Sequence, residues 1–234
     1  KNYMKILITG SQGFIGSYIC EKLLNENHQV IGLDNSQKYG VLHRAHDNNE
    51  NFKLYNLDLI KDDIQHVVIT EQPDIIIANA AIIGGLEYIN NNLYTMYSHN
   101  EQMLINTINA AIQLQKEKKI QRFIYMSSSY IYQHTDQIPF KESDIENSKI
   151  PTSFYALQKL SGEYLVRAAK EQFGIPFTII RPFNCIGLGE EIQTKDAIFQ
   201  NIKSSHVVPD LIKKIKDRKS TRLNSSHVSE SRMP

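Results

Sequence analysis

Short runs of apolar residues alternate along the chain with longer stretches in which apolar residues recur at helical spacing. The runs predict buried strands at residues 4–8, 29–33, 52–57, 74–78, 122–126 and 177–180. The stretches between them predict helices at residues 14–24, 62–70, 94–117 and 153–173. Strands that alternate with helices form βαβ units. We therefore expect an α/β fold, a Rossmann-type doubly wound parallel sheet with helices on both faces.

A glycine-rich turn, Gly10-Ser-Gln-Gly13-Phe-Ile-Gly16, joins the first predicted strand to the first helix. Glycines let the backbone turn tightly and approach a pyrophosphate, which the N–H groups of the helix N-terminus then face. Because a strand and a helix flank it, the motif predicts a dinucleotide site. Asp34 ends the second strand, where an acid contacts the adenosine ribose and repels the extra phosphate of NADP, so we expect NAD. A solvated turn residue is the alternative for Asp34.

Tyr155 and Lys159 are one helical turn apart, which places a phenol and an ammonium on one helix face. The same spacing occurs at Tyr18 and Lys22, where a surface pair is the simpler explanation. Tyr155 differs because it follows a serine-rich strand end at residues 127–129. A free tyrosine has a pKa near ~10. We expect Lys159 and a nicotinamide ring to lower it, so that the phenolate removes a proton from an alcohol during hydride transfer.

Five motifs occur in order, at residues 9–16, 34–35, 127–132, 155–159 and 181–184. They read Thr-Gly-Ser-Gln-Gly-Phe-Ile-Gly, Asp-Asn, Ser-Ser-Ser-Tyr-Ile-Tyr, Tyr-Ala-Leu-Gln-Lys and Arg-Pro-Phe-Asn. Together they resemble the extended short-chain dehydrogenase/reductases, the NAD-dependent epimerase/dehydratase family, over about residues 4–216. The resemblance implies a Rossmann domain, tightly held NAD and a nucleotide-sugar substrate.

The resemblance also implies roles for individual residues. Ser128 matches the catalytic serine, three residues before the Ile of an Ile-Tyr pair, and Ser129 is the alternative, which could instead cap the strand end. The expected catalytic residues are Ser128, Tyr155 and Lys159. The expected cofactor contacts are Gly10, Gln12, Gly13, Phe14, Ile15, Gly16, Asp34, Asn35, Asp58, Leu59, Asn79, Ala80, Ala81, Ser127, Tyr155, Lys159 and Pro182. The expected substrate contacts are Ser128, Ser129, Tyr130, Asn184 and His206, and no metal is expected.

Departures from the family pattern narrow the expected reaction. The family's dehydratases usually have an Asp-Glu pair where this chain has Ser129 and Tyr130. Members that resemble GDP-fucose synthase have Cys in place of Tyr130, although residues 83–85 and 205–209 resemble those enzymes. His206 is either an acid/base or a loop or helix-cap histidine. An epimerase with Tyr155 as base is the leading interpretation. The alternatives among enzymes are a nucleotide-sugar 4,6-dehydratase and a GDP-fucose-synthase-like epimerase/reductase. The alternatives without enzyme activity are an NAD-binding regulatory protein and an inactive fragment.

Charge and cysteine content add limits on partners and location. Lys and Arg number 26 against 25 Asp and Glu, a balance that gives no support for nucleic-acid or membrane-surface binding. No apolar run is long enough to cross a bilayer, and we recognise no signal peptide. Cys20 falls on the apolar side of a predicted helix and Cys185 in an unrelated context, so we expect a buried thiol and a reducing, cytoplasmic setting.

The end of the chain differs in composition from the rest. We expect an NAD-binding Rossmann domain at residues 1–181 and the start of a substrate-binding lobe at 182–216, a lobe that is otherwise largely missing. Residues 217–227 have the sequence that a sequencing-library adaptor would encode, and 231–234 fit its continuation, so 217–234 are expected to be foreign. The resemblance further implies a homodimer of the full-length enzyme, paired through the helices at 94–117 and 153–173.

Overall fold

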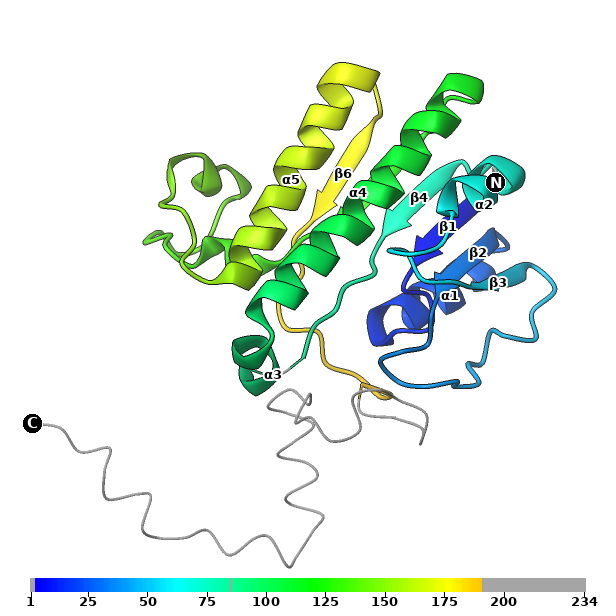
Figure 1. The fold of residues 1–234 in the computed structure, drawn as a ribbon, viewed down its shortest axis with the longest axis horizontal. Helices are drawn as coiled ribbons and strands as arrows, with labels where there is room; N and C mark the ends of the chain where they lie inside the picture. The colour runs from blue at the N-terminus through cyan, green and yellow to red at the C-terminus, as the bar shows by residue number, and fades with distance from the viewer. Residues whose placement is uncertain (1–2, 85, 191–234) are drawn as a thin grey trace, which may run out of the picture.

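Six strands form a single parallel sheet in the computed structural model, which describes residues 3–84 and 86–190. The strands are β1 (Lys5–Thr9), β2 (Gln29–Asp34), β3 (Phe52–Asn56), β4 (Ile75–Ala78), β5 (Arg122–Met126) and β6 (Phe177–Ile180). Their order is β3-β2-β1-β4-β5-β6, and each neighbouring pair is parallel. This is the order of the dinucleotide-binding fold, whose winding reverses between β1 and β4. The expected Rossmann-type α/β fold is confirmed (Figure 1).

Helices connect successive strands except β2 and β3, which are joined by a loop. The helices are α1 (Phe14–Asn25), α2 (Ile64–Glu71), α3 (Leu86–Asn91), α4 (Leu93–Glu117) and α5 (Phe154–Phe173), with 3₁₀ helices η1 (Ser129–Tyr132) and η2 (Glu142–Asn147). The four predicted helices are present, with ends shifted by one or two residues. The sequence analysis missed α3, η1 and η2, because elements of six residues or fewer are too short to show a helical repeat of apolar positions.

The helices divide between the two faces of the sheet. The helices α2, α4 and α5 cover one face, where Figure 1 shows α4 and α5 side by side, and α1 packs on the other. Successive strand residues point to opposite faces, so Leu7 packs beneath the first group and Ile8 beneath α1. Cys20 of α1 is fully buried as expected, and this burial raises the pKa of its thiol to about 12. No helix among residues 3–84 and 86–190 has the length and apolar character needed to cross a bilayer.

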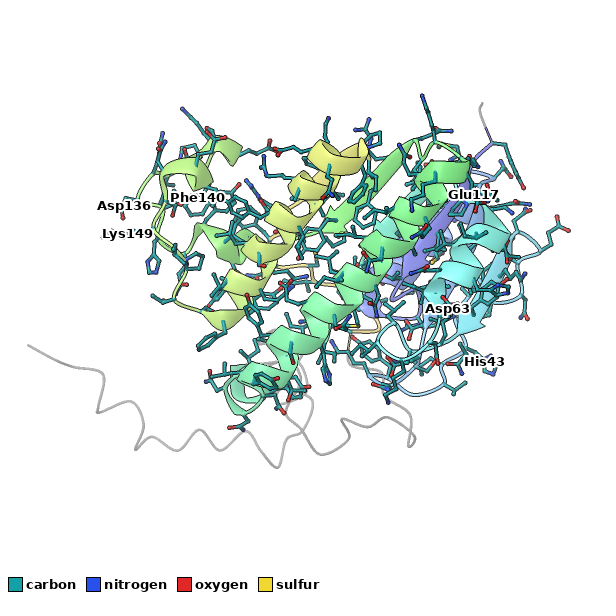
Figure 2. All side chains as sticks on the ribbon, turned by 45° about the horizontal axis from the view of Figure 1, so that its top comes forward. His43, Asp63, Glu117, Asp136, Phe140 and Lys149 are labelled. Carbon is teal, nitrogen blue, oxygen red and sulfur yellow. The ribbon has the colours of Figure 1, made fainter. Side chains whose placement is uncertain are left out.

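The loops that carry the predicted site lie at the carboxyl ends of the strands. The glycine turn follows β1, Asp34 ends β2, and Asn79 follows β4. The long β5–α5 loop, with Asp136, Phe140 and Lys149, projects beyond α5 at the end of the molecule opposite the β2–β3 loop (Figure 2). Ligands of open α/β sheets bind at the carboxyl ends of the strands, at the point where the strand order reverses.

Candidate active site

Close packing within the turn explains two of its glycines. Gly10 has φ +70°, and a Cβ there would lie 2.9 Å from the Cα of Ala80. A Cβ at Gly16 would overlap the carbonyl oxygen of Gly10. The turn, the start of α1 and the chain after β4 therefore pack backbone against backbone, which only glycine permits.

The turn suits an anionic ligand. Gly13 is the N-cap of α1 and makes no side-chain hydrogen bond to the helix, so the first N–H groups have no cap from that residue. Ser11 Oγ and Gln12 Oε1 are buried and have no hydrogen-bond partner among the described residues. The helix dipole is positive at this end. The free N–H groups and the Ser11 hydroxyl can donate to the pyrophosphate of a dinucleotide, whereas Gln12 Oε1 can only accept, for example from a hydroxyl group of the ligand.

Asp34 is held beside the turn by backbone N–H groups. Its Oδ2 accepts from Gln12 N at 2.9 Å and its Oδ1 from Ser36 N at 2.8 Å. Burial raises the pKa of Asp34, while the N–H groups of Ser36 and Gln12 and the charge of Arg44 act against that rise. The carboxylate is thus fixed at the end of β2, where the sequence predicted a contact with the adenosine ribose.

Arg44 is a site residue that the sequence analysis missed. Its Nη2 and Nε donate to the carbonyl oxygen of Gln12 at 2.6 and 3.2 Å. Gln12 Nε2 in turn donates to Asp47 Oδ1 at 3.0 Å. These bonds fasten the β2–β3 loop to the glycine turn and set the position of Gln12. No local pattern indicates the contact, because the partners are 32 residues apart.

The other predicted cofactor contacts lie around the same edge. Thr9 Oγ1 accepts from the N–H groups of Asn79 and Ala80, both at 3.0 Å, which ties the chain after β4, including Ala81, to the turn. Asp58 Oδ1 accepts from Ile60 N at 2.9 Å and so shapes the turn after β3. The cofactor contacts of all these residues stay predictions.

Ser128 and Tyr155 are brought together by the structure. Ser128 is the N-cap of η1, and its Oγ accepts from Tyr130 N at 3.1 Å. The Ser128 side chain also lies close enough to the phenol of Tyr155 to oppose the rise that burial causes in the pKa of that phenol. Ser129 instead donates its backbone N–H to the carbonyl oxygen of Pro182 at 2.9 Å. Of the two candidate serines, the geometry therefore favours Ser128 as the partner of Tyr155.

Lys159 lies behind Tyr155 and is nearly fully buried. Its Nζ donates to the carbonyl oxygen of Met126 at 2.9 Å and lies 6.0 Å from the centroid of the Tyr155 ring. Burial lowers the pKa of Lys159 to about 8, against the charge of Glu101. Within the protein itself, burial raises the pKa of Tyr155 and the Ser128 side chain opposes that rise. The expected lowering of this pKa by Lys159 together with a nicotinamide ring stays a prediction.

The second Tyr/Lys pair is a surface feature, as expected. Tyr18 is 48% exposed and donates to the carbonyl oxygen of Leu188 at 3.0 Å. Lys22 forms an exposed ion pair with Glu26. Spacing alone therefore does not identify the catalytic pair.

A buried ion pair, Glu163 with Arg181, lies next to the predicted catalytic residues and was not predicted from the sequence. Arg181 donates from Nε and Nη2 to the two carboxylate oxygens of Glu163 at 2.9 and 2.8 Å. Ser127 Oγ donates to Glu163 Oε1 at 2.7 Å. The Ser127 hydroxyl is thus committed to Glu163, so its predicted contact with the cofactor would need the backbone. The sequence does indicate that Glu163 lies near Lys159, because Glu163 follows Lys159 by one helical turn on the same side of the helix.

The expected substrate residues are only partly described. The ring of Tyr130 is 6.0 Å from the ring of Tyr155, and Asn184 is exposed beyond β6. The neighbouring rings of Tyr132, Phe140 and Phe183 stack in a column, with centroid separations of 5.0 and 6.3 Å. His206 lies outside the described residues. Substrate contacts of these residues stay predictions.

The strand order, the glycine turn with Asp34, and the Ser128–Tyr155–Lys159 set define the class of Rossmann-fold short-chain dehydrogenases/reductases. A profile of the "NAD dependent epimerase/dehydratase family" matches residues 6–230. The chain belongs to this NAD-dependent family. The match extends past residue 216, where the sequence analysis placed the start of foreign sequence, and that boundary stays a prediction.

Similar proteins agree with the family assignment. The chain is 34% identical over 190 residues to Protein CapI of Staphylococcus aureus and 32% identical over 213 residues to the uncharacterized UDP-glucose epimerase YtcB of Bacillus subtilis. These alignments cover 79% and 87% of this chain but only 55% and 63% of the relatives. The chain thus spans little more than half the length of these curated relatives.

Solved structures of epimerases resemble the fold. The UDP-N-acetylglucosamine 4-epimerase from Methanobrevibacter ruminantium, in complex with UDP-N-acetylmuramic acid, has a TM-score of 0.72 and 25% identity, over 92% of this chain and 64% of that one. The UDP-glucuronic acid 4-epimerase from Bacillus cereus, in complex with UDP-glucuronic acid and NAD, has a TM-score of 0.61 and 28% identity, over 76% and 56%.

Proposed function

We propose that this protein is an NAD-dependent nucleotide-sugar epimerase, with UDP-sugars as the substrate class. The observation that carries the proposal is the placement of Ser128 beside Tyr155, with Lys159 one helical turn away, at the strand edge that holds the glycine turn. The UDP-sugar class is supported by the similarity to the uncharacterized UDP-glucose epimerase YtcB and to the two solved UDP-sugar epimerases.

Each catalytic side chain has a task in this proposal. Tyr155 removes the proton from a sugar hydroxyl and later returns it. Ser128 donates to the sugar oxygen and steadies the carbonyl that develops there. Lys159 fixes the helix face through Met126 and supplies positive charge near the phenol when it is protonated. NAD, when bound, would supply a reversible hydride acceptor for the carbon that bears this hydroxyl.

The glycine turn and Asp34 would hold the cofactor. The N–H groups at the start of α1 face the pyrophosphate, and Asp34 accepts from the ribose hydroxyls. The same carboxylate disfavours the additional phosphate of NADP by charge repulsion. Gln12, kept in place by Arg44 and Asp47, closes the side of the turn.

We also propose the domain division expected from the sequence. Residues 1–181 would hold the cofactor and the catalytic pair, 182–216 would begin the substrate lobe, and 217–234 would be foreign. Sequencing the genomic locus tests this division, because genomic codons for residues 217–234 would contradict it.

A homodimer of the full-length enzyme in the cytoplasm completes the proposal. The helices α4 and α5 lie side by side and carry exposed apolar side chains, among them Tyr94, Ile105 and Tyr164 at 83%, 36% and 65% exposure. Such a patch suits pairing with a second copy. Light scattering should report a dimer, and a Tyr164→Lys, Ile105→Lys double variant should report a monomer.

Replacing the catalytic phenol tests the reaction. Tyr155→Phe should lower turnover of UDP-glucose, UDP-glucuronic acid or UDP-N-acetylglucosamine on the order of a hundredfold or more, while NAD binding measured by calorimetry stays within about twofold. The chain offers a matched control, because Tyr18→Phe makes the same change in a tyrosine that also precedes a lysine by four residues. Equal turnover by Tyr155→Phe and the wild type would sink the assignment.

A further inference from the structure

The Glu163–Arg181 ion pair joins five elements at the active-site end of the sheet. Glu163 of α5 is 1% exposed and binds Ser127, directly after β5, and Arg181, directly after β6. Arg181 Nη1 also donates to the phenol oxygen of Tyr132 in η1 at 2.8 Å and to the carbonyl oxygen of Glu142 in η2 at 2.9 Å. Four of the five N–H groups of this guanidinium are thereby used to fix loops against α5.

Glu163 of this pair and its partner Ser127 are close to the proposed catalytic residues along the chain. Ser127, which donates to Glu163, directly precedes Ser128. Tyr155, Lys159 and Glu163 follow one another at intervals of four residues and so lie along one side of α5. The Glu163–Arg181 pair therefore restrains both elements that bring Ser128 and Tyr155 together. It holds the Ser128 loop through the hydrogen bond from Ser127, and it holds α5, which carries Tyr155, through Glu163.

We propose that the Glu163–Arg181 pair is a positioning device that fixes Ser128 against the phenol of Tyr155. The inference rests on the proposed function, in which that contact serves proton transfer. A buried ion pair contributes little to stability compared with an apolar pair of similar size, but it specifies one geometry, because a misplaced partner leaves a buried charge unpaired. A bidentate guanidinium–carboxylate contact is the most directional form of such a pair.

The pair acts on Tyr155 through geometry. Tyr155 faces Ser128 and Tyr130 from η1, Lys159 from its own helix, and Tyr125 from β5, while Glu101 of α4 acts on Lys159. Burial raises the pKa of Tyr155, and the Ser128 hydrogen bond is what opposes the rise. A shift of the Ser128 loop should therefore raise the pKa of Tyr155 further.

Graded variants test the proposal through kinetics. Glu163→Gln should lower kcat on the order of tenfold or more, with KM for the nucleotide sugar within about threefold, because misplacement of reacting groups affects the chemical step. Ser127→Ala, which removes only the link to the Ser128 loop, should lower kcat less. Arg181→Lys should retain more activity than Arg181→Gln, because lysine keeps the positive charge that pairs with Glu163, although it loses the two-nitrogen contact of the guanidinium.

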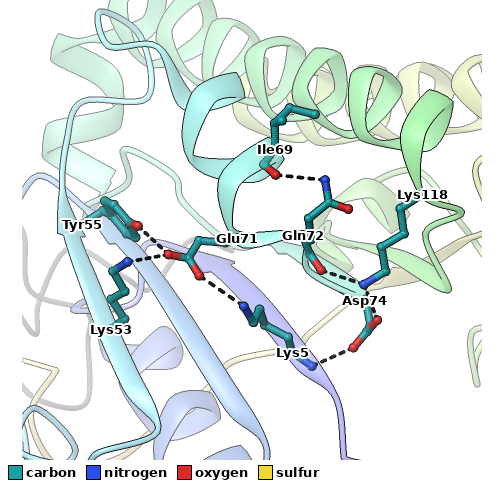
Figure 3. A network of polar contacts seen from close by, with 8 residues as sticks. All are labelled: Lys5, Lys53, Tyr55, Ile69, Glu71, Gln72, Asp74 and Lys118. Atoms are coloured by element: carbon teal, nitrogen blue, oxygen red, sulfur yellow. Dashed lines mark hydrogen bonds and ion pairs between the residues drawn. The ribbon is translucent and has the colours of Figure 1, made fainter.

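Glu71→Gln is the matched control. Glu71 is also a nearly buried carboxylate with two cationic partners, Lys5 and Lys53, but it lies at the opposite end of the strands (Figure 3). Its loss should lower thermal stability and leave kcat unchanged. A purely structural role for Glu163 would give the same pattern as Glu71 in both measurements, and that result would overturn the proposal.

A second readout needs no turnover. Protein labelled with ¹³C at tyrosine Cζ allows Tyr155 to be titrated by NMR, with Tyr155→Phe used to assign its signal. The pKa of Tyr155 should rise in Ser127→Ala and Glu163→Gln and stay unchanged in Glu71→Gln. An unchanged pKa in folded Ser127→Ala and Glu163→Gln refutes the inference. If the wild type turns over no nucleotide sugar, the proposed function fails, and this titration still decides whether the pair positions Ser128.

Discussion

Two buried glutamates, Glu71 and Glu163, form ion-pair networks at opposite ends of the strands of the same parallel sheet. The two networks contain similar chemical groups but differ in the kind of pairing. At the amino ends of the strands, Glu71 binds Lys5 and Lys53 at 3.3 and 2.6 Å and also Tyr55 (Figure 3). At the carboxyl ends, Glu163 binds Arg181 and Ser127. The first network uses flexible lysines and the second a planar guanidinium that binds through two nitrogens.

The partners differ in exposure as well as in shape. The side chain of Lys53 is 57% exposed, whereas those of Arg181 and Glu163 are 12% and 2% exposed. A lysine that reaches solvent can leave its carboxylate at little cost, while a buried guanidinium cannot. In this protein, the directional, buried ion pair lies where the geometry of the proposed site must be fixed, and the more exposed ion pairs lie where strands only need to be joined.

The largest effect is expected from breaking the buried pair. Glu163→Gln should lower the free energy of unfolding by about 3–5 kcal/mol, because it leaves Arg181 charged and buried without a counter-ion. Denaturant titration measures the loss. The double variant Glu163→Met, Arg181→Leu should recover most of the stability while kcat stays low. If kcat recovers together with stability, the Glu163 network, like the Glu71 network, serves stability alone and does not position the site.

A smaller effect is expected at Glu71. Burial alone would raise the pKa of Glu71, but hydrogen bonds from Lys53, Tyr55 and Lys5 lower it from 4.5 to about 2. A carboxylate with a lowered pKa stabilises the fold fully above its ordinary pKa, and this contribution is lost as the pH falls toward 2. Glu71→Gln should therefore cost about 1–2 kcal/mol at neutral pH, with the difference from wild type shrinking below about pH 4.5. Unfolding curves at pH 7 and pH 3.5 show whether the difference shrinks, and a constant difference would contradict the assignment.

The smallest effect is expected at Asp74, which pairs with Lys118 at 2.6 Å and accepts from the backbone of Lys5. Burial opposes ionisation of this carboxyl, but the Lys118 and Lys5 contacts lower its pKa overall. Because Lys118 is 35% exposed, Asp74→Asn should cost less than about 1 kcal/mol, and added salt should reduce the cost. A salt-independent loss larger than that of Glu71→Gln would reverse the ranking.

The sequence predicted the sheet well because buried parallel strands are continuous apolar runs that need no distant information. It also identified the glycine turn, Asp34 and the Tyr155–Lys159 spacing, which are local patterns. It missed the contacts of Arg44 with Gln12 and of Arg181 with Glu163, because a polar residue does not reveal a partner 32 or 18 residues away. The sequence also does not show that Lys159 is directed to Met126, and the lowering of the Tyr155 pKa by Lys159 together with a nicotinamide ring stays a prediction.

One partner in the amino-end network has a consequence for aggregation. Lys53 lies in β3, an outermost strand of the sheet, and outermost strands offer unpaired backbone groups to other chains. A half-exposed lysine, drawn to Glu71, puts a positive charge on this strand and discourages the pairing of a second molecule. Both outermost strands of the described residues expose an apolar side chain to a similar degree, Leu54 of β3 at 42% and Ile180 of β6 at 41%. Only β3 adds a charged residue, since β6 has none. Of these two strands, β6 should therefore be the one that first adds a strand from a second molecule, and charge introduced at Ile180 should suppress this.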